Sequence, residues 1–116
     1  MTGLALAVVL LAYFGLKINS QRSAIVLELD FGNGEKKVFY NRSFEEKKAW
    51  GLLQQVASIS GLDLVADNDF TPKKIDGYLN GDNNKKWNFY VNGTKKEISL
   101  MDVVVKIPDR IVFKFE

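Results

Sequence analysis

Lys86-Trp-Asn-Phe-Tyr-Val-Asn-Gly93 is the stretch whose pattern decides the fold, because three aromatic residues within four positions run directly into an Asn-Gly pair. Aromatic and β-branched side chains suit the half-buried surface of a pleated strand. Asn-Gly supplies the two positive-φ positions that a tight hairpin turn requires. The stretch therefore predicts an interior strand that reverses at Asn92 and Gly93.

Alternation gives this strand two faces with different expected roles. The face expected to pack on a helix carries Trp87, Phe89 and Val91. The face expected to meet solvent or a ligand carries Asn88, Tyr90 and Asn92. An exposed tyrosine with asparagine neighbours is typical of binding surfaces. Tyr78, in the preceding segment, is positioned to close over the same edge, so the predicted ligand-binding residues are Tyr78, Asn88, Tyr90 and Asn92.

The pattern of the N-terminal half of the domain predicts a hairpin followed by a helix. Residues 24–31 alternate as a strand, a Gly-Asn-Gly turn follows at 32–34, and residues 37–40 return as a second strand. Ser43 stands three residues before Glu46, the spacing of a capping box, and predicts that a helix begins there. The buried face of that helix is expected to consist of Ala49, Leu52, Leu53, Val56 and Ala57.

The helix is expected to run for about four turns and to end at Gly61 as a left-handed cap, with Ile59 packed against its last turn. Residues 62–65 alternate and are expected to form a short strand. Residues 73–85 are polar and rich in turn residues, and they predict a long ordered loop anchored by Ile75, Tyr78 and Leu79. An apolar stretch follows at 98–105, and residues 111–115 alternate as a last strand.

The N-terminal segment is expected to associate with a membrane. Residues 1–16 carry no charged side chain and are dominated by Leu, Ala and Val. The run is short for a spanning helix unless Lys17 snorkels and Ile18 extends it. An uncleaved anchor over residues 1–18 is the favoured interpretation, with a cleaved signal peptide and a buried core helix as the alternatives. A linker at 19–23 and a folded domain at 24–116 complete the predicted organisation.

Composition excludes several classes of function. Lys and Arg number 16 against 14 Asp and Glu, so the net charge of +2 is too small for a dedicated nucleic-acid binder. The chain contains neither His nor Cys, which excludes disulfides, the usual catalytic triads and most zinc sites. Five Lys-Lys doublets are interpreted as scattered surface charge. We expect a protein that is not an enzyme and that needs no cofactor.

Carboxylates offer the remaining route to catalysis or to metal binding. Asp67, Asp69 and Asp76 could supply an acid–base pair or calcium ligands, but no EF-hand spacing is present. Turn chemistry explains these residues better. No metal site is therefore predicted.

The order of elements predicts an α+β fold, a β-grasp-like mixed sheet packed on a single helix. Three segments then carry a resemblance to a known family: Ile75-Asp-Gly-Tyr78, the Trp87–Gly93 stretch, and Ile107-Pro-Asp-Arg-Ile-Val-Phe113. Together they resemble the transcobalamin C-terminal-like β-grasp family, a group of envelope domains related to the C-terminal domain of vitamin B12 carriers. Pro108 departs from the glycine that this family usually has before its last strand.

The resemblance implies an exported and anchored domain. The positive charges of Lys17 and Arg22 alone would instead predict that the chain following the anchor lies in the cytoplasm. The predicted function is a non-catalytic, membrane-anchored extracytoplasmic binding module for a small ligand such as a corrinoid. The alternative is a cell-envelope adhesion or protein-interaction module with no small-molecule ligand.

Overall fold

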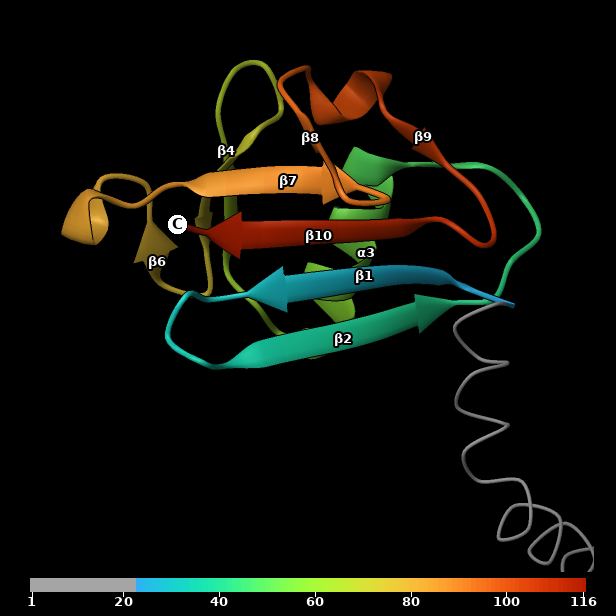
Figure 1. Ribbon diagram of the computed structural model, residues 1–116, viewed down its shortest axis with the longest axis horizontal. Helices are drawn as coiled ribbons and strands as arrows, with labels where there is room; N and C mark the ends of the chain where they lie inside the picture. Colours follow the sequence, from blue (N-terminus) through green and yellow to red (C-terminus); the bar gives the residue numbers. More distant parts are fainter. Residues whose placement is uncertain (1–22) are drawn as a thin grey trace, which may run out of the picture.

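The computed structural model describes residues 23–116, in which a mixed β-sheet packs on one α-helix (Figure 1). The predicted anchor, residues 1–18, and nearly all of the predicted linker lie outside the described residues. Within the described part, no helix combines the length and the apolar character needed to cross a membrane. The predicted α+β class, with a mixed sheet and one helix, is confirmed.

The elements follow one another closely along the chain. The strands are β1 (Ile25–Asp30), β2 (Lys36–Asn41), β3 (Lys47–Lys48), β4 (Leu64–Ala66), β5 (Pro72–Ile75), β6 (Tyr78–Leu79), β7 (Trp87–Val91), β8 (Thr94–Lys96), β9 (Val104–Val105) and β10 (Arg110–Phe115). The helices are α3 (Ala49–Ser60) and two 3-10 turns, η1 (Asp82–Asn84) and η2 (Leu100–Asp102).

The main sheet has the order β2-β1-β10-β7-β8. β1 and β10 pair in parallel at its centre, with Leu27 opposite Ile111 and Leu29 opposite Phe113, while the other pairs are antiparallel. The two predicted hairpins are therefore present, and β2 and β8 form the edges of this sheet. Since Ile25, Leu27, Leu29, Ile111 and Phe113 are all buried, the two central strands supply much of the core.

The Trp87–Val91 strand behaves as its pattern predicts. Trp87 and Phe89 are buried in the core, and Val91 packs against it. Asn92 and Gly93 both have positive φ, at 50° and 83°, and connect β7 to β8. β7 is interior because it lies between β10 and β8.

The predicted start of the helix at Ser43 is wrong. The Ser43 hydroxyl accepts a hydrogen bond from the backbone amide of Glu45, two residues along, and α3 begins only at Ala49. Lys47 and Lys48 are extended instead, because they pair with Val105 and Val104. Pairing with a strand distant in the sequence thus holds Lys47 and Lys48 in an extended conformation, although the capping-box pattern had assigned them to the helix.

The rest of the helix prediction is partly confirmed. The five predicted buried residues form the buried face of α3, and Gly61 closes it with φ 68° and ψ 26°. The helix has 12 residues, which is a little over three turns and not four. Ile59 does not pack on the last turn, since 77% of its surface is exposed.

The segment predicted as a long loop has regular structure. β5 overlaps the start of residues 73–85, and β6 lies within them. Together with β4 they form a three-stranded sheet of order β4-β5-β6. The anchor Ile75 is fully buried as predicted, whereas Leu79 is exposed. The apolar stretch at 98–105 contains η2 and β9.

Candidate ligand-binding groove

Tyr78 lies on the inward side of the main sheet. Its ring packs on Phe31 at 4.8 Å, on Phe115 at 5.6 Å and on Trp87 at 6.5 Å between ring centroids. Its hydroxyl oxygen accepts a 2.9 Å hydrogen bond from the side-chain amide of Asn33. Because Trp87 and Phe115 point toward the core, Tyr78 does not close over the face that carries Tyr90.

Asn88 and Tyr90 lie together on the opposite, outward face of β7. The Tyr90 hydroxyl donates a hydrogen bond to the Glu116 carboxylate, which also accepts one of 3.3 Å from Asn88. The Lys114 ammonium stands 5.4 Å from the centre of the Tyr90 ring. The hydrogen bond to Glu116, followed by desolvation and by the carboxylate charge, raises the pKa of Tyr90 above its ordinary value of 10.0.

Asn92 joins the hairpin turn to the start of β10. Its side chain donates a 3.0 Å hydrogen bond to Asp109 and accepts one of 2.9 Å from the backbone amide of Arg110. The Asn92 side chain therefore stabilises the turn by joining it to Asp109 and Arg110. The four residues predicted as a ligand site lie in three separate places: an inward cluster, an open sheet face and a turn.

A groove lies between strand β2 and helix α3. Its volume is about 480 Å³. The apolar side chains that line it include Ile25, Leu27, Phe39, Leu52 and Val56. Ligand pockets in proteins are typically of 300 to 1,000 Å³, mainly apolar, with a few polar groups that orient the ligand.

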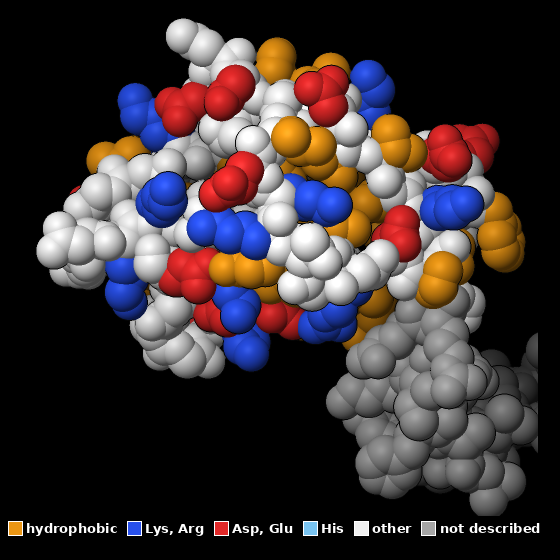
Figure 2. Space-filling model, turned by 45° about the horizontal axis from the view of Figure 1, so that its top comes forward, with side chains coloured by type: hydrophobic (Ala, Val, Ile, Leu, Met, Phe, Trp, Pro, Cys, Tyr) orange, Lys and Arg blue, Asp and Glu red, His pale blue; other side chains and the backbone are white. Residues whose placement is uncertain are grey.

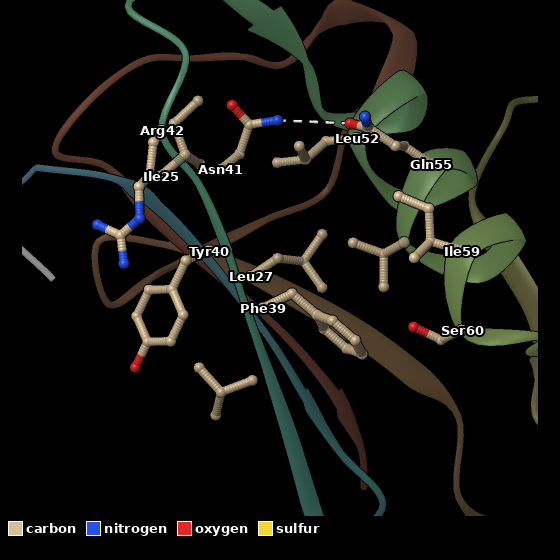
Figure 3. A pocket seen from close by; sticks show the side chains of 12 residues that line it. Ile25, Leu27, Phe39, Tyr40, Asn41, Arg42, Leu52, Gln55, Ile59 and Ser60 are labelled. Atoms are coloured by element: carbon tan, nitrogen blue, oxygen red, sulfur yellow. Dashed lines mark hydrogen bonds between the residues drawn. The ribbon is translucent and has the colours of Figure 1, made fainter. Parts of the chain in front are cut away.

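Polar side chains stand along the rim of this groove. Figure 3 shows Asn41 and Gln55 joined across one end, where the Asn41 amide donates to the Gln55 carbonyl oxygen at 3.4 Å. Ser60 and Ile59 lie on the helix side, and Phe39 fills the space between strand and helix (Figure 3). The groove thus has an apolar floor and amide or hydroxyl groups at its margin.

One side of the groove is formed by β2, which is an edge strand of the main sheet. Its residues alternate, so that Phe39 and Asn41 face the helix while Val38 and Tyr40 face away and are each about 40% exposed. β2 pairs only with β1 in the five-stranded sheet. Within the described part of the chain, the strand is therefore apolar on both faces and unpaired along one side.

The charge at the groove is positive. The segment from Lys36 to Arg42 contains Lys36, Lys37 and Arg42 and no acidic residue. Lys37 lies 3.6 Å from the Asp76 carboxylate. Arg42 stands over the Tyr40 ring at 5.8 Å, and within residues 23–116 neither Lys36 nor Arg42 forms an ion pair. Elsewhere, cations and acids are interspersed over the face shown in Figure 2, as expected for scattered lysine doublets.

Sequence reasoning missed this groove, although two signals pointed to it. Val38, Phe39 and Tyr40 make β2 apolar on both faces, which is unusual for a strand with one face in water. Ile59 is an apolar residue off the buried face of the helix. Neither signal reveals that the strand and the helix are neighbours, because that depends on the order of the strands in the sheet.

Of the three aspartates considered for catalysis or for metal binding, Asp69 and Asp76 use their carboxylates in local contacts. Asp69 accepts a 2.7 Å hydrogen bond from the Thr71 hydroxyl, and this bond lowers the pKa of Asp69 below its ordinary value. Asp67 accepts a backbone hydrogen bond from Phe70 through its carbonyl oxygen, in the same turn. Asp76 is the ion-pair partner of Lys37. Across the described residues, no three acidic side chains gather in a group that could hold a metal ion.

Comparison with known proteins supports the fold alone. No protein-family model matches the chain, and no curated protein matches it in sequence. Among solved structures, a protein of Ruminococcus gnavus described as a "putative metal binding protein" is similar, with a TM-score of 0.59 and 15% sequence identity. The match covers 81% of this chain and 96% of the other. At that identity the likeness concerns the fold and does not carry a ligand from one protein to the other.

Proposed function

We propose that this protein is a non-catalytic, membrane-anchored extracytoplasmic module that binds a ligand in the groove between β2 and α3. The observation that carries the proposal is the groove itself, whose volume of about 480 Å³, apolar floor and polar rim suit a bound ligand. A binding role is also compatible with the description of the R. gnavus neighbour.

A non-catalytic role is supported by the residues available at the groove. The whole chain lacks His and Cys, and the groove is lined by no Asp, Glu or Lys. Arg42 is its one charged lining residue, and a guanidinium stays protonated near neutral pH. The groove thus offers apolar surface, hydrogen bonds and one fixed positive charge, which support binding without general acid–base chemistry.

A small ligand such as a corrinoid is the first version of this function. It is supported by the resemblance of residues 24–116 to the transcobalamin C-terminal-like β-grasp family. The groove could receive one edge of such a large ring, with Asn41, Gln55 and Ser60 as hydrogen-bonding groups for its amide arms. The rest of the ring would lie outside the groove and meet solvent or another protein.

Titration of the full chain in mild detergent with cyanocobalamin tests this version. We expect a saturable change in absorbance and in heat in the micromolar range, and weaker binding for Ile59→Asp, which places a carboxylate beside the apolar floor. Ile98→Asp is the matched control, since Ile98 is also exposed but lies outside the groove. No change in absorbance or heat at high micromolar cyanocobalamin would exclude the corrinoid.

The alternative is an adhesion or protein-interaction module with no small-molecule ligand. The observation that favours it is the free edge of β2, which exposes Val38 and Tyr40 beside the groove. A protein partner can use the main-chain groups of such an edge together with its exposed side chains.

Membrane anchoring through residues 1–18 is proposed from their apolar, uncharged sequence. The test is fractionation of cells that express the full chain, followed by accessibility of the domain to an external protease. We expect recovery with the membranes and digestion from the outside. Recovery in the soluble fraction without detergent would contradict the anchor, and protection from external protease would contradict the extracytoplasmic location.

A further inference from the structure

We propose that the free edge of β2 binds an extended segment of a partner protein, which adds a strand to the sheet and carries acidic residues at both ends of an apolar centre. This inference rests on the proposed function, because the added strand would cover the same groove. It goes further by naming the chemical class of the ligand and the way in which it binds.

The main-chain groups of β2 make the addition of a strand possible. β2 has six residues and, among residues 23–116, pairs on one side only, with β1. In that part of the chain, alternate backbone amide and carbonyl groups on its other side have no partner in the sheet. The opposite edge strand, β8, has three residues. β2 is therefore the longer of the two free edges and the better template for an added strand.

Side chains beside the edge would recognise the added strand on both faces. On the helix side, an incoming side chain would meet the groove lined by Phe39 and Ile59, and Ile59 is largely exposed. On the other side, it would meet Val38 and Tyr40, which are about 40% exposed. Because alternate residues of a strand point to opposite faces, the added segment would use apolar residues at successive positions in its centre.

Charge decides between a second copy of this chain and a different partner. In an antiparallel pairing of two β2 edges centred near Phe39, Lys36 of one copy would lie opposite Arg42 of the other. Like charges directly opposite one another destabilise paired strands. Neither cation has an ion-pair partner within the described residues, so acidic side chains would be their natural complement. The edge thus disfavours self-pairing and favours an acidic segment.

The spacing of the two cations sets the spacing of the acids. Lys36 and Arg42 are six positions apart, which is roughly 20 Å along an extended chain. An antiparallel or parallel segment would then place acidic residues about six positions apart. The segment between them should be β-branched or aromatic, as the exposed face of β2 is.

Selection from a random heptapeptide display library tests these preferences. The target is the full chain in mild detergent, with counter-selection on the Arg42→Glu variant. We expect enrichment of peptides with acidic ends and an apolar centre. A library that shows no such enrichment over the Arg42→Glu counter-target overturns the proposal.

Charge exchange and N-methylation then test the way of binding. For a selected peptide, Arg42→Glu should weaken binding at least 10-fold, and replacement of the facing acidic residue by Lys should restore it. Lys114→Glu, an equal charge reversal on the outward face of β10, should leave the affinity unchanged. Methylation of the peptide amides that face β2 should abolish binding, whereas methylation of the alternate amides should not. Equal effects of the two methylation patterns would exclude strand addition.

The outcomes also separate this inference from the proposed function. NMR of the labelled full chain with the selected peptide should show shifts at residues 36–42. If cyanocobalamin or another small molecule shifts the groove residues and no peptide does, the groove binds a ligand and the strand-addition proposal is wrong. If neither small molecules nor peptides shift them, both proposals are wrong.

Discussion

The side-chain oxygen of Asn80 accepts a 2.7 Å hydrogen bond from the backbone amide of Trp87. The amide nitrogen of the same side chain donates to the carbonyl oxygen of Pro72 at 3.1 Å. The Trp87 indole in turn donates to the carbonyl oxygen of Tyr78 at 2.8 Å. Through these bonds one asparagine and one tryptophan fasten the small β4-β5-β6 sheet to the first residue of β7.

Asn80→Ala should therefore lower the free energy of unfolding by about 1 to 3 kcal/mol, because it leaves a partly buried amide of Trp87 without its acceptor. Urea denaturation followed by tryptophan fluorescence measures the change. Asn88→Ala, on the exposed face of β7, is the matched control and should change stability by less than about 0.5 kcal/mol. Equal effects of the two substitutions would contradict the fastening role of Asn80.

Gly32→Ala should destabilise the domain much more than Gly34→Ala, although both glycines lie in the turn between β1 and β2. Both have positive φ, at 73° and 91°, which costs an alanine about 1 to 2 kcal/mol. At Gly32 an added Cβ would also lie 2.3 Å from the carbonyl oxygen of Phe115, whereas at Gly34 it would meet nothing within 4 Å. Thermal unfolding of the two variants compares them directly, and a smaller loss for Gly32→Ala would show that the chain does not pass so close to Phe115.

Replacing Arg110 alone in the Glu28–Arg110 ion pair should lower the free energy of unfolding more than replacing both residues. Glu28 is only 7% exposed and accepts a hydrogen bond from the Arg110 guanidinium. Arg110→Met leaves that carboxylate without its partner and should cost about 1 to 3 kcal/mol. The double variant Glu28→Met/Arg110→Met should recover part of the loss, because Val38 and Val112 flank Glu28 in register. A double-mutant cycle in urea measures the coupling, and additive losses would contradict it.

Tyr90 should titrate at a higher pH than an ordinary tyrosine. Its hydroxyl donates to Glu116, and its ionisation would place a phenolate beside a carboxylate, so the pKa of Tyr90 is raised in the folded protein. The associated stability is present below the ordinary pKa of 10.0 and is lost as the pH rises through the folded value. Absorbance at alkaline pH measures the titration of the tyrosines. Glu116→Gln should bring the pKa of Tyr90 down, and an unchanged titration would contradict the contact.

Local patterns predicted those parts of the fold that local interactions decide. The alternation of Trp87, Phe89 and Val91 and the helical spacing of the α3 core residues each report on one element, and both are found as predicted. The capping signal at Ser43 was overridden because Lys47 and Lys48 pair with β9, a strand more than fifty residues away. Patterns within a short window contain no information on such a partner.

The candidate site was less predictable for the same reason. The outward face of Tyr90 follows from alternation, but the groove exists only because β2 is an edge strand beside the second half of α3. Tyr78 could not be assigned to a face from the sequence, because the β5–β6 hairpin that directs it inward consists of a four-residue and a two-residue strand. Strands that short leave almost no periodic signal.

The parallel pairing of β1 with β10 has a consequence for how the protein is made. The two strands lie at residues 25–30 and 110–115, and together they form the centre of the sheet. The ribosome must therefore synthesise residue 115 before the central pair can close, and a nascent chain that lacks β10 has no complete core. Long-range pairing of this kind also slows folding. Folding of the domain must therefore follow the synthesis of residue 115 and cannot proceed step by step with the emerging chain.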